Sequence, residues 1–170
     1  MRNILLAFIL LGIFSCKKKK DNTEDTPPVV TPTTGNTMTA KVNGNAWSVS
    51  GNNSPSSKVS VGVNSGSPKV YVFQGQTSSS LYQNVIWLYT PYTTGTVDLR
   101  TTPGCDAIYF DNTGLSYHVK TGTMNITAMD TSHVKSTKCD KFKATFSFTT
   151  DSIGGTAYKV TEGSIDFVAP

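Results

Sequence analysis

Apolar and polar residues alternate over short segments from Met38 to the end of the chain, and turn residues separate these segments. The clearest alternation runs over residues 141–149, where every second side chain is apolar: Phe142, Ala144, Phe146 and Phe148. A period of two is that of a β-strand with one buried face, because successive side chains point to opposite faces. No segment of this region repeats apolar residues at helical spacing over more than one turn. The pattern therefore predicts an all-β fold with essentially no helix.

The predicted strands are short and follow one another closely. They cover residues 38–42, 46–49, 59–63, 69–74, 85–89, 96–99, 107–110, 116–120, 123–129, 141–149, 156–160 and 164–168. Asn43-Gly44 is typical of a two-residue hairpin turn, and Thr161-Glu162-Gly163 is predicted to turn the chain between the last two strands. This succession indicates an antiparallel β-sandwich, immunoglobulin-like or related, with a lipocalin-like antiparallel β-barrel as the alternative. Residues 38–170 suffice for one core, so we expect a single all-β domain.

The N-terminal segment predicts export and anchoring. Residues 1–15 combine the charge of Arg2 with an apolar run, as a signal peptide does, and the run is shorter than the about 20 residues that span a bilayer. Ile13-Phe14-Ser15-Cys16 resembles the lipobox of bacterial lipoproteins, which implies cleavage before Cys16 and acylation of that residue. An ordinary secretory signal with an incidental cysteine is the alternative. We expect a lipid-anchored protein of the outer membrane, on the cell surface or the periplasmic face.

Residues 16–37 are charged and then rich in Pro and Thr, with too few large apolar residues to offset the entropy of ordering them. We expect this segment to be a disordered tether. The formal net charge of the chain is +4, and Lys17 to Lys20 of the tether account for much of the positive charge. The domain that follows carries no concentrated basic face, so we expect no nucleic-acid partner.

Cys105 and Cys139 are the two cysteines that remain once Cys16 is assigned to lipid. Disulfides form and persist outside the cytoplasm, so these two residues are expected to form one bridge. Such a bridge stabilises a fold chiefly by constraining the unfolded chain. Two separate thiols are the alternative.

Catalytic chemistry has little support in the sequence. The histidines are His118 and His133, with Asp111 and Asp130 near them along the chain. Asp130-Thr131-Ser132-His133 is typical of a solvated turn, since two ligands on one loop do not make a specific metal site. No nucleophile, metal or phosphate-loop motif appears. We expect no enzymatic activity, no metal and no cofactor.

Aromatic residues are the better binding candidates, because Trp and Tyr offer large, stiff surfaces to sugars or partner proteins. Trp47 is expected in the core. Trp87 and Tyr89 share one face of a predicted strand that is apolar on both faces, and Tyr92 follows Pro91 on a loop. Trp87, Tyr89 and Tyr92 are therefore the predicted ligand-binding residues.

Three segments carry a resemblance to a known family: Met38 to Trp47, Phe146 to Thr149 and Thr161 to Phe167. They resemble an uncharacterised family of Bacteroidota lipoproteins that begins with an N-G-x-x-W hairpin after the tether and ends with a G-x-(F or I)-D strand. The resemblance implies fold and location and no reaction. We expect a non-enzymatic binding module for a glycan or a protein partner. A structural or accessory subunit of an envelope complex is the second hypothesis, and a hydrolase whose carboxylates converge only in three dimensions is the third.

Overall fold

The structure is a computed structural model that describes residues 36–51, 58–64, 70–77, 82–132 and 139–169. The predicted signal peptide, Cys16, the predicted tether up to residue 35 and His133 lie outside the described residues. The strands are β1 (Thr37–Val42), β2 (Asn45–Ser50), β3 (Lys58–Asn64), β4 (Val70–Gln76), β5 (Val85–Thr90), β6 (Gly95–Asp98), β7 (Asp106–Phe110), β8 (Ser116–Asp130), β9 (Lys141–Thr150) and β10 (Lys159–Val168). The described part contains no helix, and hence no apolar helix long enough to cross a membrane. The predicted all-β class is confirmed.

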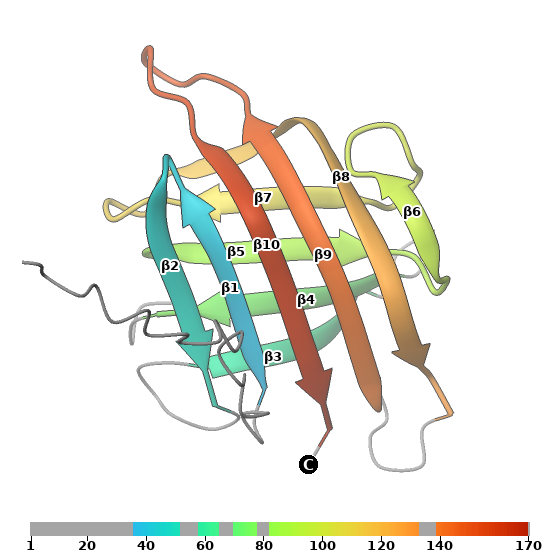
Figure 1. Ribbon diagram of the computed structural model, residues 1–170. Helices are drawn as coiled ribbons and strands as arrows, with labels where there is room; N and C mark the ends of the chain where they lie inside the picture. Colours follow the sequence, from blue (N-terminus) through green and yellow to red (C-terminus); the bar gives the residue numbers. More distant parts are fainter. Residues whose placement is uncertain (1–35, 52–57, 65–69, 78–81, 133–138, 170) are drawn as a thin grey trace, which may run out of the picture. The chain divides into compact units, whose positions relative to one another are not determined.

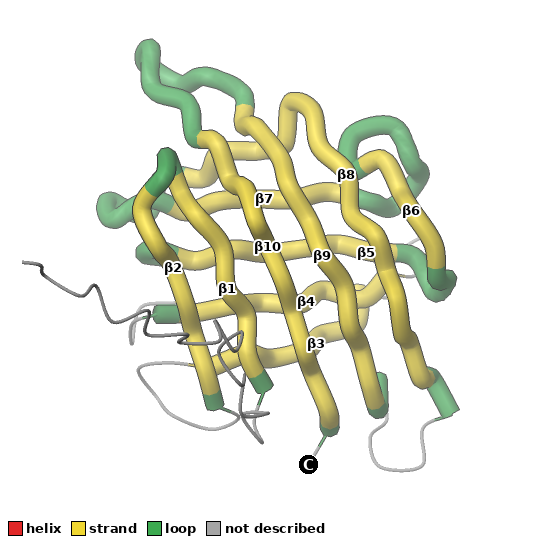
Figure 2. Tube along the Cα trace, viewed as in Figure 1, coloured by secondary structure: helices red, strands yellow, loops and turns green. Residues whose placement is uncertain are grey.

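All strand pairs are antiparallel, in the order β2-β1-β10-β9-β8-β7-β5-β4-β3, and β6 pairs with β8. Two sheets result: a front sheet of β2, β1, β10, β9, β8 and β6, and a back sheet of β8, β7, β5, β4 and β3, whose strands cross behind the first (Figure 1). Figure 2 shows how strands account for most of both layers. The first strand pairs with the last, and the sheet is nearly closed. Within the predicted class, this order follows the lipocalin-like barrel alternative more closely than an immunoglobulin-like sandwich.

β8 belongs to both sheets. Its first residues pair with β7, whereas Thr123 to Ile126 pair with β6 on the same side, and β9 runs along the other side. The strand bends where its register with β9 shifts, between Val119 and Thr121. A Cβ on Gly122 would lie 2.4 Å from Phe148 Cβ and 2.7 Å from the Ser147 carbonyl oxygen, so only glycine fits this corner.

Two predicted turns are absent from the structure. Residues 116–120 and 123–129 form one strand, and Thr161-Glu162-Gly163 does not reverse the chain but forms a bulge within β10, where the register shifts between Val160 and Gly163. Glu162 has a φ of 52°, which produces the bulge. The predicted final hairpin is therefore wrong, and β10 is one long strand paired with both β1 and β9.

The core fills the space between the two sheets. The predicted inward residues of β9 are all buried, and Phe142 stacks on Phe73 of β4 with ring centroids 3.8 Å apart. Trp47 and Met38 reach the back sheet at Gly75, where an added Cβ would lie 2.6 Å from each of them. The N-terminal end of the fold is fixed by Asn36, whose Oδ1 accepts a hydrogen bond from Val168 N at 2.6 Å and whose carbonyl accepts one from Gly51 N at 2.8 Å.

The predicted disulfide is absent, and Cys105 and Cys139 are free thiols. They lie near opposite ends of the part of β8 that runs from Thr123 to Asp130. Cys105 lies near Asp98, which pairs with Thr123, whereas Cys139 Sγ contacts the carbonyl oxygen of Asp130 at 3.4 Å. The residues from Thr123 to Asp130 extend over about 23 Å of strand, and a disulfide requires Cα atoms within about 7 Å.

Glycine 122 allows a direct stability test. Gly122→Ala should lower the free energy of unfolding by about 1–3 kcal/mol, because the new methyl group overpacks the corner against backbone atoms. Gly62→Ala on β3 is the matched control, since a Cβ there would meet nothing closer than 3.9 Å. Urea unfolding of both variants measures the difference. Equal losses would contradict the steric account of the corner.

Alkylation tests the two free thiols. Burial, followed by the nearby Asp98 charge, raises the pKa of Cys105 to about 11, and Cys139 is fully buried. We expect both thiols to react slowly with iodoacetamide in the native protein and fully in denaturant without reductant, as measured by mass spectrometry of the peptides. Detection of a Cys105–Cys139 linked peptide in non-reduced samples would contradict the structure.

Candidate functional site

β5 is apolar on both faces, as its sequence predicts. Ile86 and Leu88 point into the main core and are fully buried, so Trp87 and Tyr89 lie on the outer face of the back sheet. Both are partly buried there. The structure thus brings two of the three predicted ligand-binding residues together on one outer surface.

Four rings gather on this surface: Tyr82, Trp87, Tyr89 and Phe110. We call them the outer aromatic cluster. Trp87 lies at its centre, with ring centroids 4.9 Å from Phe110, 5.8 Å from Tyr82 and 6.4 Å from Tyr89. Tyr82 also packs on Phe110 at 5.4 Å and is 51% exposed. Tyr82 is therefore the most exposed ring of the outer aromatic cluster.

The outer aromatic cluster rests on apolar residues of its own. Val85, Ile108 and Phe110 are buried together, separately from the main core. The indole Nε1 of Trp87 is also buried and has no hydrogen-bond partner among the described residues. A buried donor without a partner costs about 1–3 kcal/mol. An apolar cluster of this kind on the outside of a sheet is a mark of interaction surfaces.

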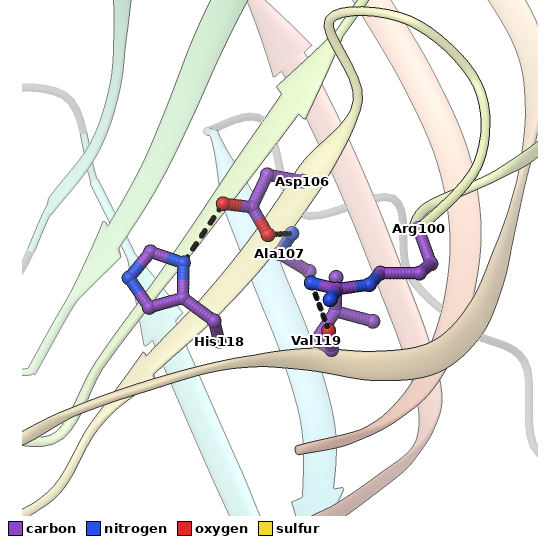
Figure 3. Close-up of polar contacts among 5 residues, drawn as sticks. All are labelled: Arg100, Asp106, Ala107, His118 and Val119. Carbon is purple, nitrogen blue, oxygen red and sulfur yellow. Dashed lines mark hydrogen bonds and ion pairs between the residues drawn. The ribbon is translucent and has the colours of Figure 1, made fainter. Parts of the chain in front are cut away.

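A polar pair borders the cluster at Tyr89. Asp106 is paired with Tyr89 in the ladder between β5 and β7, and one of its oxygens lies 2.9 Å from Nδ1 of His118 on β8. Its other oxygen accepts a hydrogen bond from Ala107 N at 2.8 Å (Figure 3). On the neighbouring stretch of β8, Arg100 donates to the Val119 carbonyl oxygen at 3.4 Å. Burial, then the Asp106 charge, raises the pKa of Tyr89, so its phenol is a neutral donor near pH 7.

The chemistry of His118 and Asp106 is that of a hydrogen-bonding pair. An imidazole oriented by a carboxylate acts as a base when a hydroxyl or thiol lies within hydrogen-bond reach of its other nitrogen. No such contact to His118 occurs among the described residues, and the same residues contain no group of three metal-ligating side chains. The expectation that the protein is not an enzyme stays a prediction.

Tyr92 lies apart from the cluster. It follows the C-terminal end of β5, and its ring packs edge-on against the buried Tyr71 with centroids 4.3 Å apart. It also lines a small cleft with Thr93, Thr94 and Met129. Burial raises the pKa of Tyr71 to about 12, with smaller contributions from Cys139 and Tyr92. Tyr92 therefore covers the edge of the main core while remaining 42% exposed.

Three members of this surface were not predicted: Tyr82, Phe110 and Asp106. The alternation over residues 107–110 does not indicate which face Phe110 takes, and Tyr82 precedes the predicted strand 85–89. The pairing of Asp106 with His118 follows from the register of the β7–β8 hairpin, in which Ile108 opposes His118. A register derived from the turn at Gly114 would have placed the acid diagonally across from the imidazole.

Comparison of the chain with protein-family models, with curated proteins and with solved structures finds no match in any of the three.

Proposed function

We propose that this protein is a lipid-anchored, non-enzymatic binding module of the outer membrane that contacts a partner protein through the outer aromatic cluster. The observation that carries the proposal is the exposed Tyr82 packed on Trp87 and Phe110, outside the main core. Tyr and Trp are the residues in which protein interfaces concentrate their binding energy.

The composition of the surface supports a protein interface. Its centre is apolar and aromatic, and Asp106 and His118 form a polar border, which matches the arrangement of a hydrophobic core with a polar rim.

Ring geometry favours a protein over a glycan at this surface. The planes of Tyr82, Tyr89 and Phe110 are inclined by 50°, 58° and 59° to that of Trp87. Rings inclined in this way form an uneven surface into which side chains can pack, and they do not form one flat platform for several sugar rings in a row. Binding of a glycan here is therefore the other outcome of the test.

The anchor supports the location. Acylation of Cys16 would hold the chain to a membrane through several acyl chains, at about 0.8 kcal/mol per buried CH₂. A flexible tether of this length reaches about 25 Å, so the domain stays close enough to raise its effective concentration toward other envelope proteins.

Tyr82 gives the direct test, with Tyr92 as its matched control because both are exposed tyrosines on different surfaces. A photo-crosslinking amino acid at position 82 of the full chain, expressed in the native host, should yield a discrete protein adduct that position 92 does not. With the partner identified by mass spectrometry, Tyr82→Ala should weaken its binding at least about ten-fold, and Tyr92→Ala should leave it unchanged.

Other outcomes separate the hypotheses. Equal adducts at positions 82 and 92, or none at 82, would overturn the proposed surface. Loss of glycan binding in Tyr82→Ala, without any protein adduct, would assign the surface to a glycan. A partner that stays bound in fixed stoichiometry through purification would make the protein an accessory subunit of an envelope complex.

Cys16→Ser tests the anchor. The variant lacks the thiol that accepts the diacyl group, so it should lose incorporation of radiolabelled palmitate. Cys105→Ser, which removes a thiol of the folded domain, is the control and should be labelled as strongly as the unchanged protein. Equal labelling of Cys16→Ser and Cys105→Ser, or no labelling of the unchanged protein, would contradict lipidation of Cys16.

A further inference from the structure

A second surface lies at the end of the barrel, beside the β1–β2 hairpin and the start of β5. It is a cleft of about 260 Å³. Its lining combines aromatic rings with side-chain amides: Val42, Asn43, Asn45, Ala46, Trp47, Asn84, Tyr109 and Tyr158. The volume falls just below the about 300–1,000 Å³ of sites for drug-sized ligands, which suits a ligand of one ring.

Hydrogen bonds to Asn84 fix one wall of the cleft. The Trp47 indole N–H donates to the Asn84 carbonyl oxygen at 3.1 Å, and the Tyr109 hydroxyl donates to Asn84 Oδ1 at 3.2 Å. Asn84 has a φ of 52°, a conformation that asparagine tolerates better than most residues. The wall is thus preorganised, which lowers the entropy cost of binding.

The same bonds leave amide donors available. Because Asn84 Oδ1 accepts from Tyr109, its Nδ2 is the remaining polar atom of the side chain, and it has no partner among the described residues. The exposed Asn45 side chain has none in that part of the chain either. Asn43 uses Oδ1 to accept from Lys159 N at 2.8 Å, so its amide nitrogen also remains.

The cleft has a neutral lining. No residue that lines it is acidic or basic. Asp111, the acid that acts on Tyr109 and Tyr158, is buried, and its carboxylate already accepts hydrogen bonds from Thr113 and Leu115. Burial, then the neighbouring Tyr158 and Asp111, raises the pKa of Tyr109 to about 12, which keeps this phenol a donor.

Aromatic faces supply the remaining contact. Tyr158 lies against Tyr109 with ring centroids 4.6 Å apart and against Tyr117 at 4.8 Å, so its ring is held in place. The Trp47 indole is fixed by its bond to Asn84. A sugar ring has both features that this lining matches, namely apolar C–H faces that pack on aromatic rings and hydroxyl groups that accept from amides.

We propose that this cleft, which Trp47 lines from the core side, binds a single neutral sugar ring packed on the partly exposed Tyr158 and hydrogen-bonded by the amides of Asn45 and Asn84. Phosphorylated and acidic sugars are disfavoured, because no cation lines the cleft to compensate their charge. This site is independent of the outer aromatic cluster, so either proposal can fail alone.

The two tryptophans of the chain provide a readout for each surface. In a ¹H–¹⁵N spectrum of the full chain, one indole signal belongs to Trp47 in the cleft and the other to Trp87 in the outer aromatic cluster, and Trp87→Phe assigns them. The probes are the methyl glycosides of glucose, galactose, mannose and N-acetylglucosamine. Methyl glucuronide and glucose 6-phosphate are the charged counterparts.

We expect at least one neutral glycoside to shift the Trp47 indole signal saturably, with a dissociation constant of about 1 mM, while the Trp87 signal stays in place. Asn45→Ala and Asn84→Asp should each weaken this binding about ten-fold. Asn125→Ala, which removes an exposed amide on the outer face of β8, is the matched control and should change nothing.

Three results would overturn the proposal. The first is a Trp47 signal that does not move with any neutral glycoside at up to about 50 mM. The second is tighter binding of the charged probes than of the neutral ones. The third is a shift that Asn45→Ala and Asn125→Ala affect equally, and this comparison holds even where Asn84→Asp does not fold, because Asn45 is exposed.

Discussion

The close contact between Gly122 of β8 and Phe148 of β9 allows a single strand to serve two sheets. Without that bend, β8 would continue straight past β9, and the strands paired to its first half could not cross behind the front sheet. The back sheet then brings Phe73 onto Phe142, and Gly75 under Trp47 and Met38. The core is therefore a consequence of one corner at which a side chain would not fit.

The two proposed binding surfaces share one short segment at the start of β5. Tyr82 lies on the outer face of the back sheet, and Asn84 reaches into the cleft at the barrel end. Asn84 has a positive φ, and this turn of the backbone lets its side chain and that of Tyr82 face different surfaces. A segment of this kind is positioned from both sides, by Trp47 and Tyr109 inside and by Phe110 outside. Two surfaces of different chemistry can thus share one rigid support.

Alternation along the chain was sufficient to predict the strands and the inward residues of β9, because burial of one sheet face leaves a direct record in the sequence. The alternation was not sufficient to predict whether a glycine lies in a turn or inside a strand. Gly122 lies in the predicted break between strands 116–120 and 123–129, and Gly163 lies in the predicted turn 161–163, yet both glycines lie inside strands where Phe148 and Phe146 approach the backbone. Glycine suits a turn and a close approach equally well, so the residue alone cannot distinguish them.

The candidate site residues could also be predicted only in part. Trp87 and Tyr89 could be predicted as a pair, since residues two apart in one strand lie on the same face. Asp106 joins them through the pairing of β7 with β5, and Tyr82 joins them by packing on Trp87 and Phe110. Both contacts depend on how the strands are aligned, which a single sequence leaves open. The cysteines illustrate the limit most clearly: their number suggested a bridge, but the distance between them is set by the length of β8.

The place of β1 in the sheet has a mechanical consequence. This strand lies between β2 and β10, and Asn36 at its start is bonded to the end of β10. A force applied through the chain that precedes Asn36 would load the hydrogen bonds of two ladders at once, in shear, instead of opening one edge strand bond by bond. A domain loaded in this way resists being pulled apart through its N-terminal end.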